Sequence, residues 1–146
     1  MENYKRPETP CLSTDIIIEY NDGKKEGIVL IERKFPPYGL ALPGGHAEIG
    51  LTLEENARKE GSEETSLDVM IESLLCVKSD PKRDPRVHMV AVVFVGKGKG
   101  SINAGDDAAA ARLYSIEEVR ALRGKEKFAF DHEKIIDEYL RWRGDL

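Results

Sequence analysis

The chain has 146 residues, of which 40% are hydrophobic and 34% are charged, and its formal net charge is -5. This length fits a single domain, residues 1–146, with a substantial buried core. The negative charge argues against nucleic acid as the main partner, since binding a phosphate backbone needs a basic surface. The longest apolar runs are too short to span a bilayer, and the N-terminal residues lack the apolar stretch of a signal peptide. We therefore expect a soluble cytoplasmic protein without a membrane partner.

The first elements in chain order are two strands. The β-branched run within residues 11–20 predicts one strand, Asn-Asp-Gly at 21–23 predicts a turn, and residues 27–33 predict the returning strand. A proline-containing loop at 33–39 follows. It leads to a short extended segment that ends at Pro-Gly-Gly, residues 43–45.

Residues 53–65 are predicted to form a helix, because Thr52 and Glu55 have the spacing of a capping box. Leu53, Ala57 and Gly61 recur at helical spacing and mark the side that faces the core. Gly61 costs up to about 1 kcal/mol relative to Ala in a helix interior. It either lets a neighbouring element approach closely or weakens the helix, and both readings stay open at this point.

Three further strands are predicted after this helix. Their residue patterns place them at 68–77, 87–95 and 109–114. The glycine-rich segment at 96–105 is predicted to be a flexible connection between the last two.

Two more helices are predicted toward the C-terminus. Ser115 and Glu118 form a second capping box before a short helix, and a last helix is expected to begin near Asp131. The apolar stripe of the last helix consists of Ile135, Ile136, Tyr139 and Trp142. Cys11 and Cys76 form no metal or disulfide pattern, so each is predicted to be a small core residue. Strands mixed with three helices indicate an α/β fold with helices on both faces of the sheet.

Three carboxylates crowd one face of the helix predicted at 53–65. At about 100° per residue, Glu63 lies roughly 60° to one side of Glu60 and Glu64 roughly 40° to the other. Like charges at these spacings repel each other, and a cation between them turns the repulsion into binding. Hard oxygen ligands suit Mg²⁺ or Mn²⁺, ions that usually accompany phosphate chemistry. A solvated acidic surface is the alternative.

This region resembles the Nudix box, G-x5-E-x7-R-E-U-x-E-E-x-G-U, in which U is a bulky aliphatic residue. Aligned from Gly45, the chain keeps the Glu-x-x-Glu-Glu core and the final aliphatic position, Leu67. The box is degenerate at four positions, where the chain has Leu51 for the first Glu, Lys59 for the Arg, Gly61 for the aliphatic residue and Ser66 for the second Gly.

Three segments outside the box resemble the ADP-ribose pyrophosphatase-like branch of the Nudix hydrolase superfamily. They are Asp-Pro-Arg-Val-His at 84–88, Ala-Gly-Asp-Asp-Ala at 104–108 and Phe-Asp-His-Glu-Lys at 130–134. The resemblance implies the Nudix fold, an α/β/α sandwich with a mixed β-sheet. It also implies Mg²⁺-dependent hydrolysis of the diphosphate bond of ADP-ribose, or of a related nucleoside diphosphate derivative, to AMP and a sugar phosphate.

The resemblance further implies which residues hold the metal and do the chemistry. The family's metal-ligand positions correspond to Gly44, through its backbone carbonyl, Glu60, Glu63 and Glu64, with Mg²⁺ or Mn²⁺ as the cofactor. Lys59 and Leu51 replace an Arg and the Glu that pairs with it, so both halves of a supporting ion pair have changed, and we expect a repacked but working site. The general base often lies on a loop outside the box, where Asp106 and Asp107 are candidates beside Glu63. For the two Asp residues, ordinary turn chemistry is the alternative.

Four residues are candidates for substrate binding: Arg33, Arg86, His88 and Phe130. The forked donors of Arg suit phosphate or ribose oxygens, and Phe130 can stack on adenine. The structural alternatives are a surface Arg at a strand end, a core His88 and a packed Phe130. Asp131 is expected to be the N-cap of the last helix.

Two other functions remain open. The first is hydrolysis of nucleoside triphosphates or dinucleoside polyphosphates, which shares the metal chemistry. The second is a non-catalytic nucleotide-binding domain, suggested by the altered box positions. In each case the partner is a small-molecule nucleotide, and the apolar segments also permit a homodimer.

Overall fold

The β-branched run after Asp15 forms the central strand of the sheet in the computed structural model, which describes residues 3–105 and 108–146. This strand, β1 (Cys11–Asn21), pairs in parallel with β6 (Met89–Lys99) and antiparallel with β2 (Glu26–Arg33). On the far side, β6 pairs antiparallel with β5 (Asp68–Lys78), so the sheet is mixed. A continuous apolar run suits a strand that is buried on both faces.

Three shorter strands extend the sheet. The strands β3 (Leu40–Ala41) and β7 (Ala108–Ser115) both pair antiparallel with β2. The strand β4 (Gly44–His46) pairs antiparallel with β1, at the end of β1 that β2 does not reach. This last pairing matters for the site, because it brings the two glycines beside β1.

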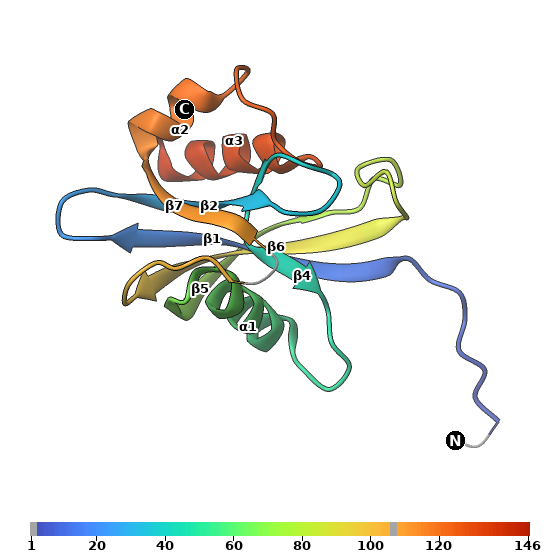
Figure 1. Ribbon diagram of the computed structural model, residues 1–146. Coiled ribbons are helices and arrows are strands. Elements are labelled where there is room, and N and C mark those ends of the chain that lie inside the picture. The colour runs from blue at the N-terminus through green and yellow to red at the C-terminus, as the bar shows by residue number, and fades with distance from the viewer. Residues whose placement is uncertain (1–2, 106–107) are drawn as a thin grey trace.

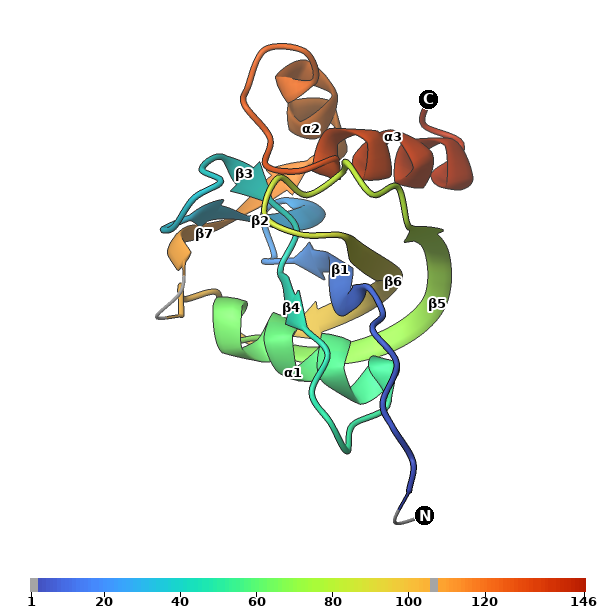
Figure 2. The same cartoon turned by 90° about the vertical axis from the view of Figure 1, so that its right-hand side faces the viewer.

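Helices cover both faces of the sheet (Figure 1). The helix α1 (Leu53–Thr65) packs on one face, and α2 (Ile116–Leu122) and α3 (His132–Arg143) pack on the other, as Figure 2 also shows. Adjacent residues of β1 serve opposite layers, since Ile16 and Ile18 belong to the core under α1, whereas Ile17 belongs to the core under α3. The predicted α/β/α sandwich with a mixed sheet is confirmed.

The helix bounds follow the local capping signals. The helix predicted at residues 53–65 is α1, with the same bounds. At its start the Thr52 hydroxyl accepts a hydrogen bond from the Glu55 backbone N–H. The capping box of Ser115 and Glu118 is present in both directions at the start of α2. No helix among the described residues is long and apolar enough to cross a membrane.

The flexible connection predicted at 96–105 is wrong in its first part, because β6 continues through Lys99. Gly96 and Gly98 are sites of close approach within this strand. A Cβ on Gly96 would lie 2.4 Å from the Met70 carbonyl oxygen, and one on Gly98 would lie 2.8 Å from side-chain atoms of both Ile18 and Leu67. The glycines therefore allow tight packing inside the sheet, which composition alone does not distinguish from a flexible linker.

Three predicted core residues are not fully buried. Trp142 is 55% exposed and stacks on Tyr139, so the buried stripe of α3 ends before it. Cys11 is exposed because it begins β1 at the edge of the covered region, and Cys76 is half-buried. Burial and the neighbouring Glu138 raise the pKa of the Cys76 thiol to about 12.

The structure settles the open question about Gly61 in favour of close approach. A Cβ at this position would lie 3.2 Å from the Ile16 side chain and 3.3 Å from that of Ile18. The missing side chain therefore lets α1 sit tightly on β1.

We expect Gly61→Leu to lower the free energy of unfolding by about 1–3 kcal/mol, because the added side chain overpacks this contact. Urea denaturation measures the change. Leu at the exposed first-turn position Glu54 is the control, with an expected change within about 0.5 kcal/mol. If Gly61→Leu were as stable as the original chain, the close-packing account would be wrong.

Candidate active site

The candidate site lies where β1 and β2 separate. The strand β2 pairs with β1 at residues 19–21, whereas β4 pairs with it at residues 13–15. Between these pairings β2 diverges toward β7, and a pocket of about 470 Å³ lies there. Its lining comes from β1, β2, β4, α1, the segment 83–89 and the start of α3. A pocket of this size suits a small molecule.

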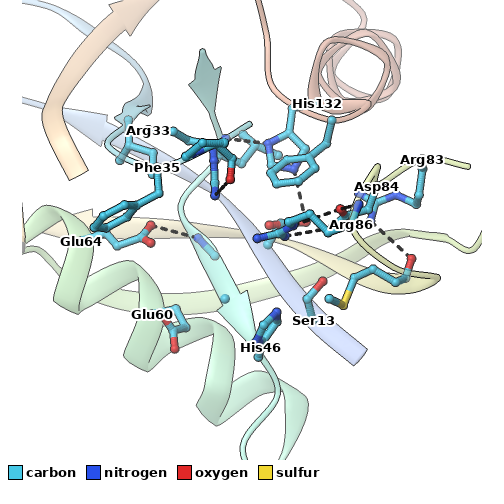
Figure 3. A pocket seen from close by; sticks show the side chains of 18 of the residues that line it. Ser13, Arg33, Phe35, His46, Glu60, Glu64, Arg83, Asp84, Arg86 and His132 are labelled. Atoms are coloured by element: carbon cyan, nitrogen blue, oxygen red, sulfur yellow. Dashed lines mark hydrogen bonds and ion pairs between the residues drawn. The ribbon is translucent and has the colours of Figure 1, made fainter. Parts of the chain in front are cut away.

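One wall of the pocket is acidic and is built on the two glycines. Glu60 and Glu64 of α1 line the pocket with Gly44 and Gly45 (Figure 3). The Gly44 N–H donates a hydrogen bond of 3.0 Å to the Glu64 carboxylate. A Cβ on Gly45 would lie 2.6 Å from the Glu60 carboxyl group, and one on Gly44 would lie 2.2 Å from the Asp15 carboxylate. Only glycine fits at position 44, where a Cβ would also lie 2.4 Å from the Thr14 backbone carbonyl oxygen, whereas a side chain at position 45 would displace the Glu60 carboxylate.

The third glutamate of the helix points elsewhere. The Glu63 side chain is 55% exposed, lies 3.4 Å from the Lys59 ammonium group and is not among the residues that line the pocket. Among residues 3–105 and 108–146, no group of three or more His, Cys, Asp or Glu side chains is gathered closely enough to hold a metal ion. The oxygen donors of Glu60 and Glu64 suit Mg²⁺ or Mn²⁺ chemically, and the full ligand set stays a prediction.

Lys59, which stands where the Nudix box has Arg, forms an ion pair with Glu48 in place of the residue at position 51. Lys59 lies 2.8 and 2.9 Å from the two carboxylate oxygens of Glu48, three positions before Leu51. The Glu48 backbone N–H donates to the buried Asn56 side chain, and Asn56 donates in turn to the Thr14 hydroxyl. The hydrogen bond to Glu48 is the main cause that raises the pKa of Lys59 above its ordinary value. The sequence analysis missed Glu48 because it compared only the box positions.

We expect Glu48→Gln to lower kcat/KM by about tenfold, since partners of residues next to a metal site typically matter by 10–100-fold. Adding Leu51→Glu, which returns the carboxylate to the position found in the box, should recover most of the loss. Steady-state kinetics measures both. The free energy of unfolding should change little, because the Glu48–Lys59 pair is exposed. Unchanged kinetics in Glu48→Gln would remove Glu48 from the site.

The opposite wall of the pocket is cationic and aromatic. The guanidinium carbons of Arg33 and Arg86 lie 4.8 and 5.1 Å from the centre of the Phe130 ring. Arg33 is held by the Pro37 carbonyl oxygen, which accepts a 2.7 Å hydrogen bond, and no carboxylate of the described residues lies within ion-pair distance of it. Burial, and then the charge of Arg86, lower the pKa of Arg33, which stays a cation at neutral pH. These three predicted residues thus meet in one place.

Two ion pairs shape the cationic wall. The buried Asp84 carboxylate accepts hydrogen bonds of 3.0 and 2.9 Å from Arg86. Burial raises the pKa of Asp84, but the hydrogen bonds from Arg86 outweigh it and hold the pKa below its ordinary value. Asp131 accepts two hydrogen bonds from Arg83 and makes no side-chain cap bond to α3. Asp131 therefore occupies the predicted N-cap position of α3, but its carboxylate makes no cap hydrogen bond because it pairs with a residue 48 positions away.

Of the other predicted residues, His88 lies outside the pocket and two lie outside the described part of the chain. The His88 ring faces the Ser79 carbonyl oxygen at 2.9 Å, and the residue is neither in the pocket nor fully buried. Asp106 and Asp107, the candidate bases, lie outside the described residues. His46, which follows the two glycines, is exposed and lines the pocket (Figure 3).

Asp15 and His132 are two further pocket residues that the sequence analysis did not name as candidates. Asp15 is 7% exposed and His132 is 2% exposed. The signal for Asp15 was a charged residue at the start of a fully buried apolar run. The signal for His132 was weaker, because its place beside Asp15 depends on tertiary contacts between β1 and α3.

A model of the NUDIX domain family matches residues 10–139. The chain belongs to the Nudix family. An ADP-ribose pyrophosphatase from Methanocaldococcus jannaschii is 41% identical to this Nudix chain, over 98% of this chain and 80% of that protein. Family membership makes the chain a Nudix hydrolase, as the resemblance predicted.

Solved structures agree on the fold. A MutT/nudix family protein from Enterococcus faecalis superposes with a TM-score of 0.81 at 28% identity, over 98% of this chain and 65% of that one. The NUDIX domain of Shewanella oneidensis NrtR, solved with ADP-ribose, has a TM-score of 0.82 at 21% identity, over 97% of this chain and 94% of that one. A bifunctional NMN adenylyltransferase/ADP-ribose pyrophosphatase from Francisella tularensis, solved with AMP and a Mn ion, has a TM-score of 0.76 at 23% identity, over 94% of this chain and 43% of that one.

Proposed function

We propose that this Nudix hydrolase cleaves the diphosphate bond of ADP-ribose, or of a close nucleoside diphosphate derivative, to AMP and a sugar phosphate. The observation that carries the proposal is a single pocket with Glu60 and Glu64 on one wall and Arg33, Arg86 and Phe130 on the other. The names of the Methanocaldococcus jannaschii relative and of the ligand in the NrtR structure support the choice of ADP-ribose.

The two walls have complementary tasks. A diphosphate carries negative charge, which Arg33 and Arg86 attract through their forked donors beside the Phe130 ring. Glu60, Glu64 and the Gly44 carbonyl would hold Mg²⁺ or Mn²⁺, with Glu63 as a further ligand, and Lys59 orients this helix through Glu48. When bound, such an ion neutralises phosphate charge and lowers the pKa of bound water.

We propose Asp106 or Asp107 as the base that takes the proton from the attacking water. Asp106→Asn or Asp107→Asn should lower kcat by about 100-fold, within the range of general-base catalysis, while Mn²⁺ affinity stays nearly unchanged. Initial rates and calorimetric Mn²⁺ titration measure the two effects. Original rates in both variants would discard these candidates and leave Glu63.

The function is tested by incubating the protein with a nucleotide panel and Mg²⁺ in ¹⁸O-labelled water. Preferential release of AMP from ADP-ribose, with label in one product, supports the proposal and identifies the phosphorus attacked. Preferential release of pyrophosphate from triphosphates would replace it with a triphosphate hydrolase. Binding of ADP-ribose without cleavage, with either Mg²⁺ or Mn²⁺, would make the chain a nucleotide-binding domain.

Two further properties are proposed, the cellular location and the oligomeric state. We propose a cytoplasmic protein, and the homodimer that the sequence permits stays a prediction. Light scattering at micromolar concentration decides between a monomer and a dimer.

A further inference from the structure

The Asp15 carboxylate lines the pocket and accepts no hydrogen bond within ordinary length from the described residues. Asp15 is 7% exposed. It lies on the same face of β1 as Ser13, which also lines the pocket. Within the described part of the chain, no side chain or backbone group donates a hydrogen bond to the Asp15 carboxylate. Its nearest ionisable partner is His132, whose Nε2 lies 3.6 Å from Oδ2, beyond ordinary hydrogen-bond length. No fully buried side-chain oxygen or nitrogen of the described residues lacks a hydrogen-bond partner, so the Asp15 carboxylate is open to the pocket and can accept hydrogen bonds from a ligand there.

The partner of Asp15 is fixed in one tautomer. The Leu42 backbone N–H donates a 3.0 Å hydrogen bond to His132 Nδ1, so Nδ1 carries the lone pair. The imidazole proton therefore sits on Nε2, on the side that faces Asp15. A second proton on Nδ1 would break the bond to Leu42. His132 accordingly presents a neutral N–H toward the floor of the pocket, and it does not cancel the charge of Asp15.

The surroundings of Asp15 select the kind of group that can approach it. Gly44 closes one side, because even a Cβ there would lie 2.2 Å from the Asp15 carboxylate. Arg33 and Arg83 both interact electrostatically with Asp15, so the carboxylate is not isolated in an apolar environment. A phosphate has no donor at neutral pH to offer and meets a like charge at this point. A sugar hydroxyl is neutral and donates, and two adjacent hydroxyls can satisfy both carboxylate oxygens.

We propose that Asp15, with His132 behind it, accepts hydrogen bonds from the hydroxyl groups of a substrate ribose and so favours a sugar-bearing diphosphate over a triphosphate. The inference rests on the proposed function and names the feature of the pocket that distinguishes ADP-ribose from ATP. The carboxylate can accept hydrogen bonds from either the adenosine ribose or the terminal ribose, but only the terminal ribose is absent from ATP. The experiment has one arm for each.

Binding is measured by calorimetry in EDTA, so that neither hydrolysis nor metal affinity enters the readout. The ligands are ADP-ribose, ADP and 2′-deoxy-ADP. Asp15→Asn is compared with the original chain and with Asp68→Asn, an exposed position paired with Arg58, as the matched control. Thermal unfolding of each variant checks the fold.

In the original chain we expect the ligand with the recognised ribose hydroxyls to bind about tenfold more tightly than the ligand without them, and Asp15→Asn should remove this difference. Tenfold is the scale of a hydrogen bond to a charged group. Loss of the advantage of ADP-ribose over ADP assigns the terminal ribose, and loss of the advantage of ADP over 2′-deoxy-ADP assigns the adenosine ribose. The first result supports the proposal. The second overturns it, because ATP carries the same adenosine ribose, and unchanged preferences in both arms overturn it as well.

A substrate-side measurement keeps the test valid if Asp15→Asn fails to fold. The original chain is then titrated with ADP-ribose, the methyl ester of ADP and ATP. Equal affinity for all three overturns the inference, whereas weaker binding of the ester and of ATP supports it. Failure of the original chain to bind any adenine diphosphate would instead count against the proposed function itself.

Discussion

Glu64→Gln should lower kcat for ADP-ribose by about 100-fold or more, equivalent to about 3 kcal/mol of transition-state stabilisation. Glu64 is buried in the acidic wall, and its carboxylate accepts a hydrogen bond from the Gly44 N–H. Gln keeps the shape and an acceptor oxygen for that bond but removes the negative charge that a divalent ion needs. The effect should therefore fall on chemistry and metal binding, with little effect on the fold.

Two measurements accompany the rate. Calorimetric titration with Mn²⁺ should show weaker binding in Glu64→Gln, and thermal unfolding should show nearly the original midpoint. Glu54→Gln, an exposed position in the first turn of the same helix, is the control for a general change in helix charge. A Glu64→Gln variant with the original rate at saturating Mg²⁺ would exclude Glu64 from the metal site.

Asp131→Ala should lower the free energy of unfolding by about 3–5 kcal/mol, the scale for breaking a buried ion pair on one side. The Arg83 side chain is 4% exposed and that of Asp131 is 15% exposed, and two hydrogen bonds join them. Removing the carboxylate leaves the Arg83 guanidinium buried without its partner. Urea denaturation followed by circular dichroism measures the loss.

The exposed pair of Arg58 and Asp68 is the control, because breaking it with Asp68→Ala should cost less than about 1 kcal/mol. The double variant Arg83→Met/Asp131→Leu should recover much of the loss, since apolar side chains can replace a buried pair without leaving a lone charge. A cost for Asp131→Ala as small as that of the control would mean that water reaches Arg83 readily.

Local signals predicted the helices and most strands, because caps and alternating patterns act over a few residues. The helix at 53–65 was found from Thr52 and Glu55: the Thr52 hydroxyl accepts from the Glu55 backbone N–H, and the Glu55 carboxylate accepts from that hydroxyl. Gly96 and Gly98 misled the strand prediction, since their role is close packing against residues distant in sequence. The same limit hid the true partner of Asp131, which is Arg83 and not the helix N-terminus.

The sequence predicted the pocket residues of the charged helix and the arginines, but it did not predict Asp15. Glu60, Glu64, Arg33, Arg86 and Phe130 all line the pocket, as expected from the family's motifs. Glu48 and Asp15 were not found, because each acquires its role only through the fold. The first reaches Lys59 across a loop, and the second faces His132 across the gap between a strand and a helix.

The two faces of the central strand β1 have different roles at neighbouring residues, so the strand is sensitive to a shift of one residue. Thr14 anchors the loop before α1 through Asn56, and its neighbour Asp15 faces the pocket on the opposite side. A one-residue insertion or deletion between Asp15 and the buried Ile16 would exchange the two sides, and both functions would be lost together. Changes of substrate preference during evolution should therefore accumulate in the loop at 33–39 and the segment at 83–89, where length can vary without shifting this strand.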